Sequence, residues 1–255
     1  MITDPSFYFA AIPAVLIFGI AKGGFGGGIV IVAVPLMALV VSPITAAAIL
    51  LPILCVMDLM ALWVFRGHWI WRELKLLVPA SILGILLGAL LFEYMNVHLI
   101  RLTLGTISLL YTIQYWWYQI RQSAAPQERL GSVVGITAGT AAGFTSFVAH
   151  AGAPPLSFYL LRRGMDRTSF VATATVFFWV VNYTKLIPYA WLGLLDTSNL
   201  ITSLVLCPLA PIGIALGKWL HDRVSDSFFF NFFYITLFIL GCKLTWDGIV
   251  GLQFI

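Results

Sequence analysis

Two stretches of small residues interrupt the apolar segments of this chain: Lys22-Gly23-Gly24-Phe25-Gly26-Gly27-Gly28 and Thr145-Ser146-Phe147-Val148-Ala149-His150-Ala151-Gly152. Glycine at this density breaks helices. The first stretch separates the apolar segments 7–20 and 29–41, and the second separates 132–144 and 153–161. Segments of about 10–14 residues are more often re-entrant than spanning. We therefore expect two broken or re-entrant helix pairs, although the topology derived below is the same if these segments cross fully.

The composition restricts the class of protein. Of the 255 residues, 61% are hydrophobic and only 9% are charged, whereas a soluble domain carries about 25% charged residues. These values argue against a soluble enzyme, a nucleic-acid binder and a secreted module. The apolar runs are continuous, unlike the alternating strands of a membrane barrel. The sequence therefore predicts an all-α polytopic membrane protein.

No motif predicts a metal or cofactor site. Cys55, Cys207 and Cys242 lie within apolar segments and lack the spacing of metal ligands. The net charge of +4 fits basic cytoplasmic loops, which are typical of membrane proteins, better than a nucleic-acid surface. We therefore expect no cofactor, no nucleic-acid partner and no enzymatic activity. The lipid bilayer is the expected environment, and the sequence leaves open whether the protein forms a homo-oligomer.

The chain divides into two similar halves. Each broken pair is followed by three longer apolar segments, which are 44–65, 76–95 and 99–119, then 168–193, 199–220 and 228–250. The run from Pro79 through Gly84 to Gly88 lines up with the run from Pro208 through Gly213 to Gly217 at a constant offset. We expect residues 1–120 to form one repeat, 121–131 a cytoplasmic linker, and 132–255 the second repeat.

Basic residues set the orientation, because cytoplasmic loops collect Lys and Arg. They concentrate in 66–75, 121–131, 162–167 and 218–227, whereas the alternate loops are poor in them. With the basic loops inside, both termini lie outside. Three spans is an odd number, so the second half is inverted relative to the first. Inverted-topology repeats with broken helices are common in secondary transporters.

Irregular backbone at membrane depth is tolerated only inside protein or beside a water-filled cavity. The two breaks therefore predict a central cavity, with the N-termini of segments 29–41 and 153–161 pointing into it. Helix N-termini carry free N–H donors and partial positive charge, which favour an anion. Glycines 23, 24, 26, 27 and 28 allow close approach of a ligand to the backbone, or they serve helix packing. We assign the spaced glycines 131, 135, 139 and 143, and the two aligned pairs above, to packing.

Polar side chains at membrane depth are candidates for function. Lys22 either contacts the anion or snorkels to the cytoplasmic interface. His150 either donates a hydrogen bond or carries a proton, or it is structural. Thr145 and Ser146 either donate to the substrate or satisfy the broken backbone, and we add Phe25 and Gly152 as neighbours of the breaks.

Three more polar residues lie in the longer segments. Asp58 and Asn182 occupy matching places in the two halves, and Lys185 lies one turn beyond Asn182. Asp58 is either a coupling carboxylate or the partner of Lys22. Asn182 and Lys185 are candidate substrate ligands, and Lys185 otherwise lies near the outer surface.

These motifs resemble the sulfite exporter TauE/SafE family. The resemblance rests on the run from Gly19 to Gly28 before Val34-Pro35-Leu36, and on the run from Ala142 to Leu156 followed by Ala172-Thr173. It implies a multi-pass permease of the bacterial inner membrane, with sulfite and organosulfonates as substrates. His150 and the smaller number of glycines in the second break depart from a symmetric pattern, so the two ends of the site are expected to be unequal.

The expected function is export of a small sulfur-containing anion by alternating access. An anion channel using the same helix termini, or a permease for another small anion, is the alternative. Ser146 and His150 are four residues apart, but an intramembrane hydrolase would need a third member that the sequence lacks.

Overall fold

The chain is all-helical in the computed structural model, which describes residues 2–24, 30–92, 94–121, 131–221, 223 and 226–253. No strand occurs in these ranges. The elements are α1 (Pro5–Gly24), η1 (Val30–Val32), α2 (Ala33–Met37), α3 (Pro43–Val64), α4 (Trp71–Phe92), α5 (Val97–Arg121), α6 (Ser132–Ala149), α7 (Ala153–Leu161), α8 (Arg167–Trp191), α9 (Thr197–Leu206), α10 (Leu209–His221) and α11 (Asp226–Gln253).

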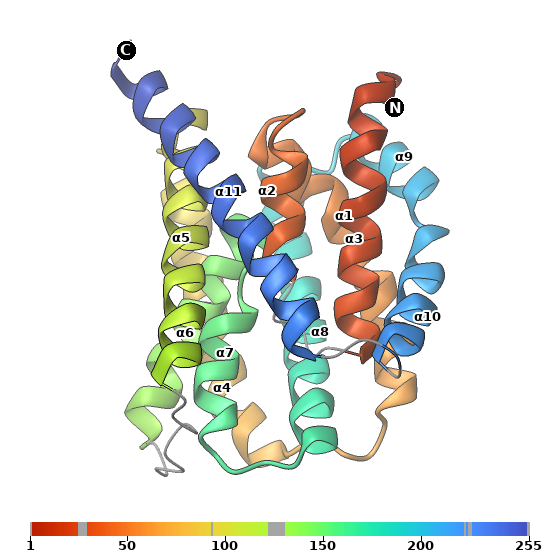
Figure 1. The fold of residues 1–255 in the computed structure, drawn as a ribbon, viewed down its shortest axis with the longest axis vertical. Coiled ribbons are helices and arrows are strands. Elements are labelled where there is room, and N and C mark those ends of the chain that lie inside the picture. The colour runs from red at the N-terminus through yellow and green to blue at the C-terminus, as the bar shows by residue number, and fades with distance from the viewer. Residues whose placement is uncertain are drawn as a thin grey trace.

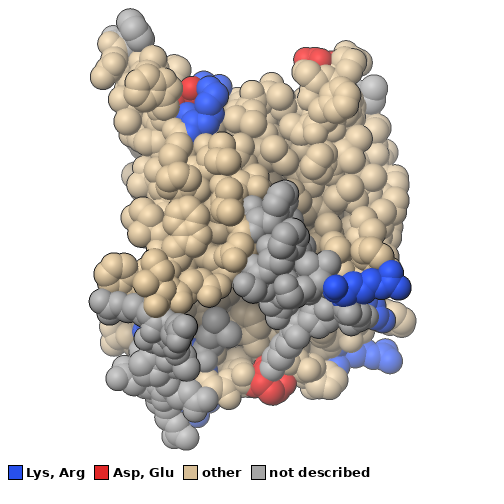
Figure 2. All heavy atoms as spheres, in the orientation of Figure 1, with Lys and Arg blue, Asp and Glu red and all other residues tan. Residues whose placement is uncertain are grey.

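Within these ranges, six helices are long and apolar enough to cross a membrane, and α9 with α10 forms one further bent pair. On the face seen in Figure 2, the Lys, Arg, Asp and Glu side chains of the described residues lie toward the two ends, and the described residues between them are of other types. A bilayer core requires such a band. The predicted all-α polytopic membrane fold is confirmed.

The expectation that segments 7–20 and 132–144 are too short to span is wrong. Helix α1 continues through Gly23 to Gly24, and α6 continues through Thr145 and Ser146 to Ala149. At 20 and 18 residues, both pass as candidate spans. Gly23 does not break α1, and a Cβ there would meet the backbone of Ile214 on α10. The stretch of α6 from Thr145 to Ala149 contains neither glycine nor proline, so the helix can continue through it. The second break is thus limited to residues 150–152, while Phe25, Gly26, Gly27 and Gly28 lie outside the described residues.

The expected span 199–220 is present as two helices, α9 and α10, that together are long and apolar enough to cross a membrane but are not collinear. The chain bends by 42° between α9 and α10, at Cys207 and Pro208. Proline has no N–H and its ring clashes with the preceding turn, so it breaks a helix at this position. The Asp196 and Asp166 carboxylates cap α9 and α8 by accepting the backbone N–H of Asn199 and Ser169, and these bonds to Ser169 lower the pKa of Asp166.

The most extensive helix contacts join segments that are far apart in sequence: α1 with α10, α4 with α6, and α5 with α11, with α3 against α8 in the centre. Glycines allow this approach. A Cβ at Gly19 would lie 2.6 Å from Cα of Gly213, and a Cβ at Gly84 would lie 2.7 Å from the Phe144 nitrogen. The packing role is thereby confirmed for Gly84, Gly88, Gly135, Gly139, Gly143, Gly213 and Gly217. It is wrong for Gly131, because a Cβ added there would meet nothing within 4 Å; this residue instead precedes α6 as its N-cap.

Both termini lie at the same end of the molecule, the upper end in Figure 1. The loops that join α3 to α4 and α7 to α8 lie at the opposite end. Those two loops carry Arg66, Arg162 and Arg163. The separation of basic loops from the termini agrees with the expected topology, and the side of the membrane on which each end lies stays a prediction.

Candidate functional site

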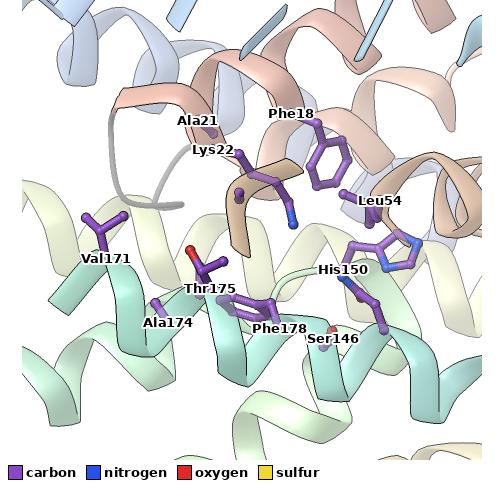
Figure 3. A pocket seen from close by; sticks show the side chains of 13 residues that line it. Phe18, Ala21, Lys22, Leu54, Ser146, His150, Val171, Ala174, Thr175 and Phe178 are labelled. Carbon is purple, nitrogen blue, oxygen red and sulfur yellow. The ribbon is translucent and has the colours of Figure 1, made fainter. Parts of the chain in front are cut away.

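A small cavity, partly open to the outside, lies between the ends of α1 and α6 and the facing parts of α3 and α8. Its lining consists of Phe18, Ala21, Lys22, Leu54, Ala61, Ser146, His150, Ala153, Val171, Ala174, Thr175, Phe178 and Asn182. In Figure 3 the Lys22 side chain extends from α1 into this space, with Thr175 and Phe178 of α8 on the opposite wall. The sequence predicted a central cavity beside the helix breaks, and this cavity lies beside the break at residues 150–152.

Lys22 is held by a carboxylate beside the cavity. Its ammonium forms an ion pair and a short hydrogen bond with Oδ1 of Asp58. The other carboxylate oxygen, Oδ2, accepts a hydrogen bond from Nδ2 of Asn182 at 2.6 Å. Asp58 is fully buried, whereas the Lys22 side chain is 13% exposed. Of the two predicted roles of Asp58, the structure thus shows it as the partner of Lys22, and it brings both together with Asn182.

Lys185 lies behind the cavity wall, not near the outer surface. It is fully buried, and its ammonium nitrogen lies 3.0 Å from both Ser146 O and Ser146 Oγ and 2.7 Å from Nδ1 of His150. No carboxylate lies within ion-pair distance of it in the part of the chain that the structure describes. Lys185 is therefore a buried amine with neutral partners only, and Ser146 and His150 separate it from the cavity.

His150 connects the break to α3. It is the residue that closes α6, and its backbone is left-handed, with a φ of 52° that L-residues rarely adopt. Its Nε2 lies 2.9 Å from the carbonyl oxygen of Ala47. A carbonyl can only accept, so Nε2 carries the hydrogen and Nδ1 is the acceptor facing Lys185. The ring is thus fixed as a neutral imidazole with a defined tautomer.

Of the two expected anion-binding helix N-termini, that of segment 29–41 begins outside the described residues, and the other is that of α7. Ala153, the first residue of α7, lines the cavity, but Pro154 and Pro155 follow it. Proline has no N–H, so α7 lacks two of the donors on which a helix-terminus anion site depends. In the first half, α2 has five residues and none of them lines the cavity. Side-chain cations therefore carry more of the positive charge at this site than helix termini do.

The remaining predicted residues lie around the cavity rather than in its wall. The Thr145 hydroxyl bonds to the carbonyl oxygens of Ala141 and Ala151, so it supports the break. A Cβ at Gly152 would lie 2.6 Å from the Ala142 oxygen, and one at Gly23 would contact the backbone of Ile214 on α10. Both glycines serve close packing. Gly24 ends α1.

Sequence reasoning missed the apolar part of the wall. Phe18, Leu54, Val171 and Phe178 line the cavity together with the hydroxyl-bearing Thr175. Such side chains do not stand out in a chain that is 61% hydrophobic. The arrangement is a mostly apolar chamber with one cationic, hydrogen-bonding side, which suits a ligand with an anionic head and an apolar body.

A comparison with protein families finds one match that covers most of the chain. The family model described as sulfite exporter TauE/SafE matches residues 11–244. Searches of curated proteins and of solved structures find no match. The match covers the cavity and the helices that surround it.

Proposed function

Because the chain belongs to the sulfite exporter TauE/SafE family, we propose that it exports a small organosulfonate or sulfite across the bacterial inner membrane, and that the anion binds in the cavity beside Lys22. Membership of this family implies a membrane transporter of sulfur anions, and the proposal includes no enzymatic step. The observation that carries the proposal is the cationic side of the cavity: Lys22, paired with Asp58, lines it, and Lys185 lies directly behind Ser146 and His150.

The charge balance favours an anion. When Lys22, Lys185 and Asp58 are all ionised, the site carries one net positive charge. Lys22 is paired with Asp58, so a sulfonate that binds to Lys22 has to share or displace this carboxylate. Charges at membrane depth are costly unless they are paired, so a ligand that compensates the excess charge gains binding energy from it.

The wall of the cavity favours an organosulfonate over sulfite. Phe18, Leu54, Val171 and Phe178 offer apolar surface that an inorganic anion cannot use. We infer that the sulfonate head lies near Lys22, Ser146 and Asn182, and that the hydrocarbon part lies against the aromatic side chains.

Contacts between the two halves support alternating access between inverted repeats. Gly84 of α4 faces Thr140 of α6, and Gly213 of α10 faces Leu16 of α1. The offset between Leu16 and Thr140 in sequence equals the offset between Asp58 and Asn182. Two halves related by a pseudo-two-fold axis would give such exchanged pairs. We propose that these paired helices move relative to α3 and α8 during transport.

Thermal unfolding in detergent tests ligand binding. Benzenesulfonate should raise the unfolding midpoint more than sulfite does, whereas benzyl alcohol should have no effect. The double variant Lys22→Met/Asp58→Asn removes the pair without leaving a lone buried charge, and it should bind benzenesulfonate about tenfold to a hundredfold more weakly, since hydrogen bonds to charged groups contribute about 1.5–3 kcal/mol.

The matched control is Lys243→Met. Lys243 bonds to Asp247 on the exposed side of α11, at 2.8 Å, so its loss should leave the benzenesulfonate shift unchanged. The proposal fails if no sulfur anion changes the midpoint of the wild-type protein. Currents of single-channel size in planar bilayers would favour the anion channel over the carrier.

A further inference from the structure

The buried cluster of Lys185, Ser146 and His150 has a property that the transport proposal does not use. Its hydrogen bonds can be satisfied in two protonation states without any atom heavier than hydrogen moving. Lys185 has three partners: the Ser146 carbonyl oxygen and the Ser146 hydroxyl, both at 3.0 Å, and His150 Nδ1 at 2.7 Å. Two of these three partners, the carbonyl oxygen and His150 Nδ1, can only accept a hydrogen bond.

As an ammonium, Lys185 donates three hydrogen bonds, one to each partner. The Ser146 hydroxyl is then an acceptor toward Lys185, and its own hydrogen is free to point elsewhere. As a neutral amine, Lys185 donates two hydrogen bonds, to the carbonyl oxygen and to His150, and its lone pair accepts the Ser146 hydrogen. The same positions therefore fit both states, and the states differ in where the Ser146 hydrogen points.

The direction of this hydrogen matters because Ser146 lines the cavity. While Lys185 is neutral, the Ser146 hydrogen is engaged away from the cavity. Once Lys185 is an ammonium, the hydroxyl can donate to a ligand. An anion in the cavity also compensates the buried ammonium, which has no carboxylate partner among the described residues. Both effects make the anion and the proton stabilise each other, and such coupling is reciprocal.

We propose that Lys185 takes up one proton from water when the anion binds, with the Ser146 hydroxyl turning from Lys185 toward the anion. The inference rests on the proposed function and adds the coupling ion. The loaded site then holds one more proton than the empty site. For a sulfonate with one negative charge, anion and proton together add no net charge, and the direction of transport follows the sum of the two gradients.

Other ionisable groups face Lys185 from the helices packed around it. They are Lys22 of α1, Cys55 and Asp58 of α3, and His150 of α6. Lys22 and Asp58 are paired with each other. His150 already carries its hydrogen toward Ala47, so a second hydrogen on Nδ1 would face the Lys185 nitrogen. Lys185 is thus the group whose protonation its hydrogen bonds accommodate best.

The experiment measures benzenesulfonate binding and proton uptake by calorimetry on the full chain in nanodiscs, from mildly acidic to alkaline pH, in buffers with different ionisation enthalpies. Benzenesulfonate stays ionised throughout, so any pH dependence belongs to the protein. We expect uptake of up to one proton per anion, and an affinity that falls about tenfold per pH unit at alkaline pH.

Three variants assign this proton. Lys185→Met should bind more weakly at low pH and lose the pH dependence. Ser146→Ala should bind about tenfold more weakly and take up less of the proton on binding, because it lacks the hydroxyl but keeps the backbone carbonyl at that position. Lys243→Met should behave as the wild-type protein does.

Each outcome is decisive. Binding by the wild-type protein without proton uptake overturns the coupling and leaves the proposed function intact. A pH dependence that survives in Lys185→Met assigns the proton to another group and overturns the role of Lys185. Absence of binding at every pH removes the proposed function and the coupling with it. If Lys185→Met does not fold, proton uptake by the wild-type protein and by Ser146→Ala still decides whether the coupling exists.

Discussion

Asp58 is the residue on which the polar contacts of the cavity converge. Its two carboxylate oxygens bind Lys22 and Asn182 from two different helices, and its side chain has no exposed surface. A buried carboxylate is tolerated only when it is paired and hydrogen-bonded. The contacts of Asp58 therefore join α1, α3 and α8 on one side of the cavity.

Removing Asp58 alone should be more harmful than removing the whole pair. Asp58→Ala leaves Lys22 as an unpaired cation in a mostly buried position, and breaking one partner of a buried pair costs about 3–5 kcal/mol. We expect a lower free energy of unfolding for Asp58→Ala, and recovery of most of the loss in Lys22→Met/Asp58→Ala. A double-mutant cycle from denaturant unfolding measures the coupling, and additive effects would show that the pair does not stabilise the fold.

The charged residues of the site could be predicted from the sequence, whereas its aromatic residues could not. Lys22, Asp58 and Lys185 are conspicuous because charges are rare at membrane depth. Phe18 and Phe178 were missed because an aromatic side chain that faces a cavity and one that faces lipid have the same sequence pattern. The contact between Lys185 and the Ser146 hydroxyl was also missed, because a hydrogen bond to a neutral hydroxyl cannot be recognised from charge or residue spacing.

At the scale of helices, glycines decide how closely the two halves approach. Gly19 of α1 and Gly213 of α10 place their backbones in contact, and Gly143 of α6 meets the backbone of Ser81 on α4. These helix faces pack against each other rather than against lipid, so they gain van der Waals contact along their length. The sequence suggested packing for the aligned glycines, but it suggested a break where α1 and α6 continue, because glycine in a packed helix and glycine in a break look alike.

Substitution of Gly19 by alanine should destabilise the fold. The new Cβ would lie within 3 Å of three backbone atoms of α10, and backbone cannot move aside as a flexible side chain can. Overpacking costs about 1–3 kcal/mol, which exceeds the gain in helix propensity of about 1 kcal/mol. Thermal unfolding of Gly19→Ala should show a lower midpoint.

Gly131→Ala is the control, because nothing lies within 4 Å of a Cβ there. Alanine is a poorer N-cap than glycine, so the unfolding midpoint of Gly131→Ala should fall slightly, but less than that of Gly19→Ala. Equal midpoints for Gly19→Ala and the wild-type protein would mean that α1 and α10 separate easily, in conflict with the close contact described above.

At the scale of the whole molecule, the expected topology rests on two independent sequence patterns, which are the number of apolar spans and the distribution of basic loops. The number of spans between basic loops places both termini at one end, and the structure has them there. This placement did not require exact helix boundaries, because charge counting depends on loops. The bend between α9 and α10 did not enter the prediction, because a single proline within an apolar run permits either a kink or a stop.

The orientation in the membrane can be tested with single cysteines in a background without Cys55, Cys207 and Cys242. His68 is exposed in the basic loop between α3 and α4, and Tyr94, after α4, is 84% exposed. Since cytoplasmic loops collect basic residues, we expect a membrane-impermeant maleimide to label Tyr94→Cys in intact spheroplasts and His68→Cys only in inverted vesicles. Labelling of both positions from one side would mean that α4 does not cross the membrane. Labelling with the two sides exchanged would show that the basic loops face outward, and the cavity beside Lys22 would then have to receive its anion from the other compartment.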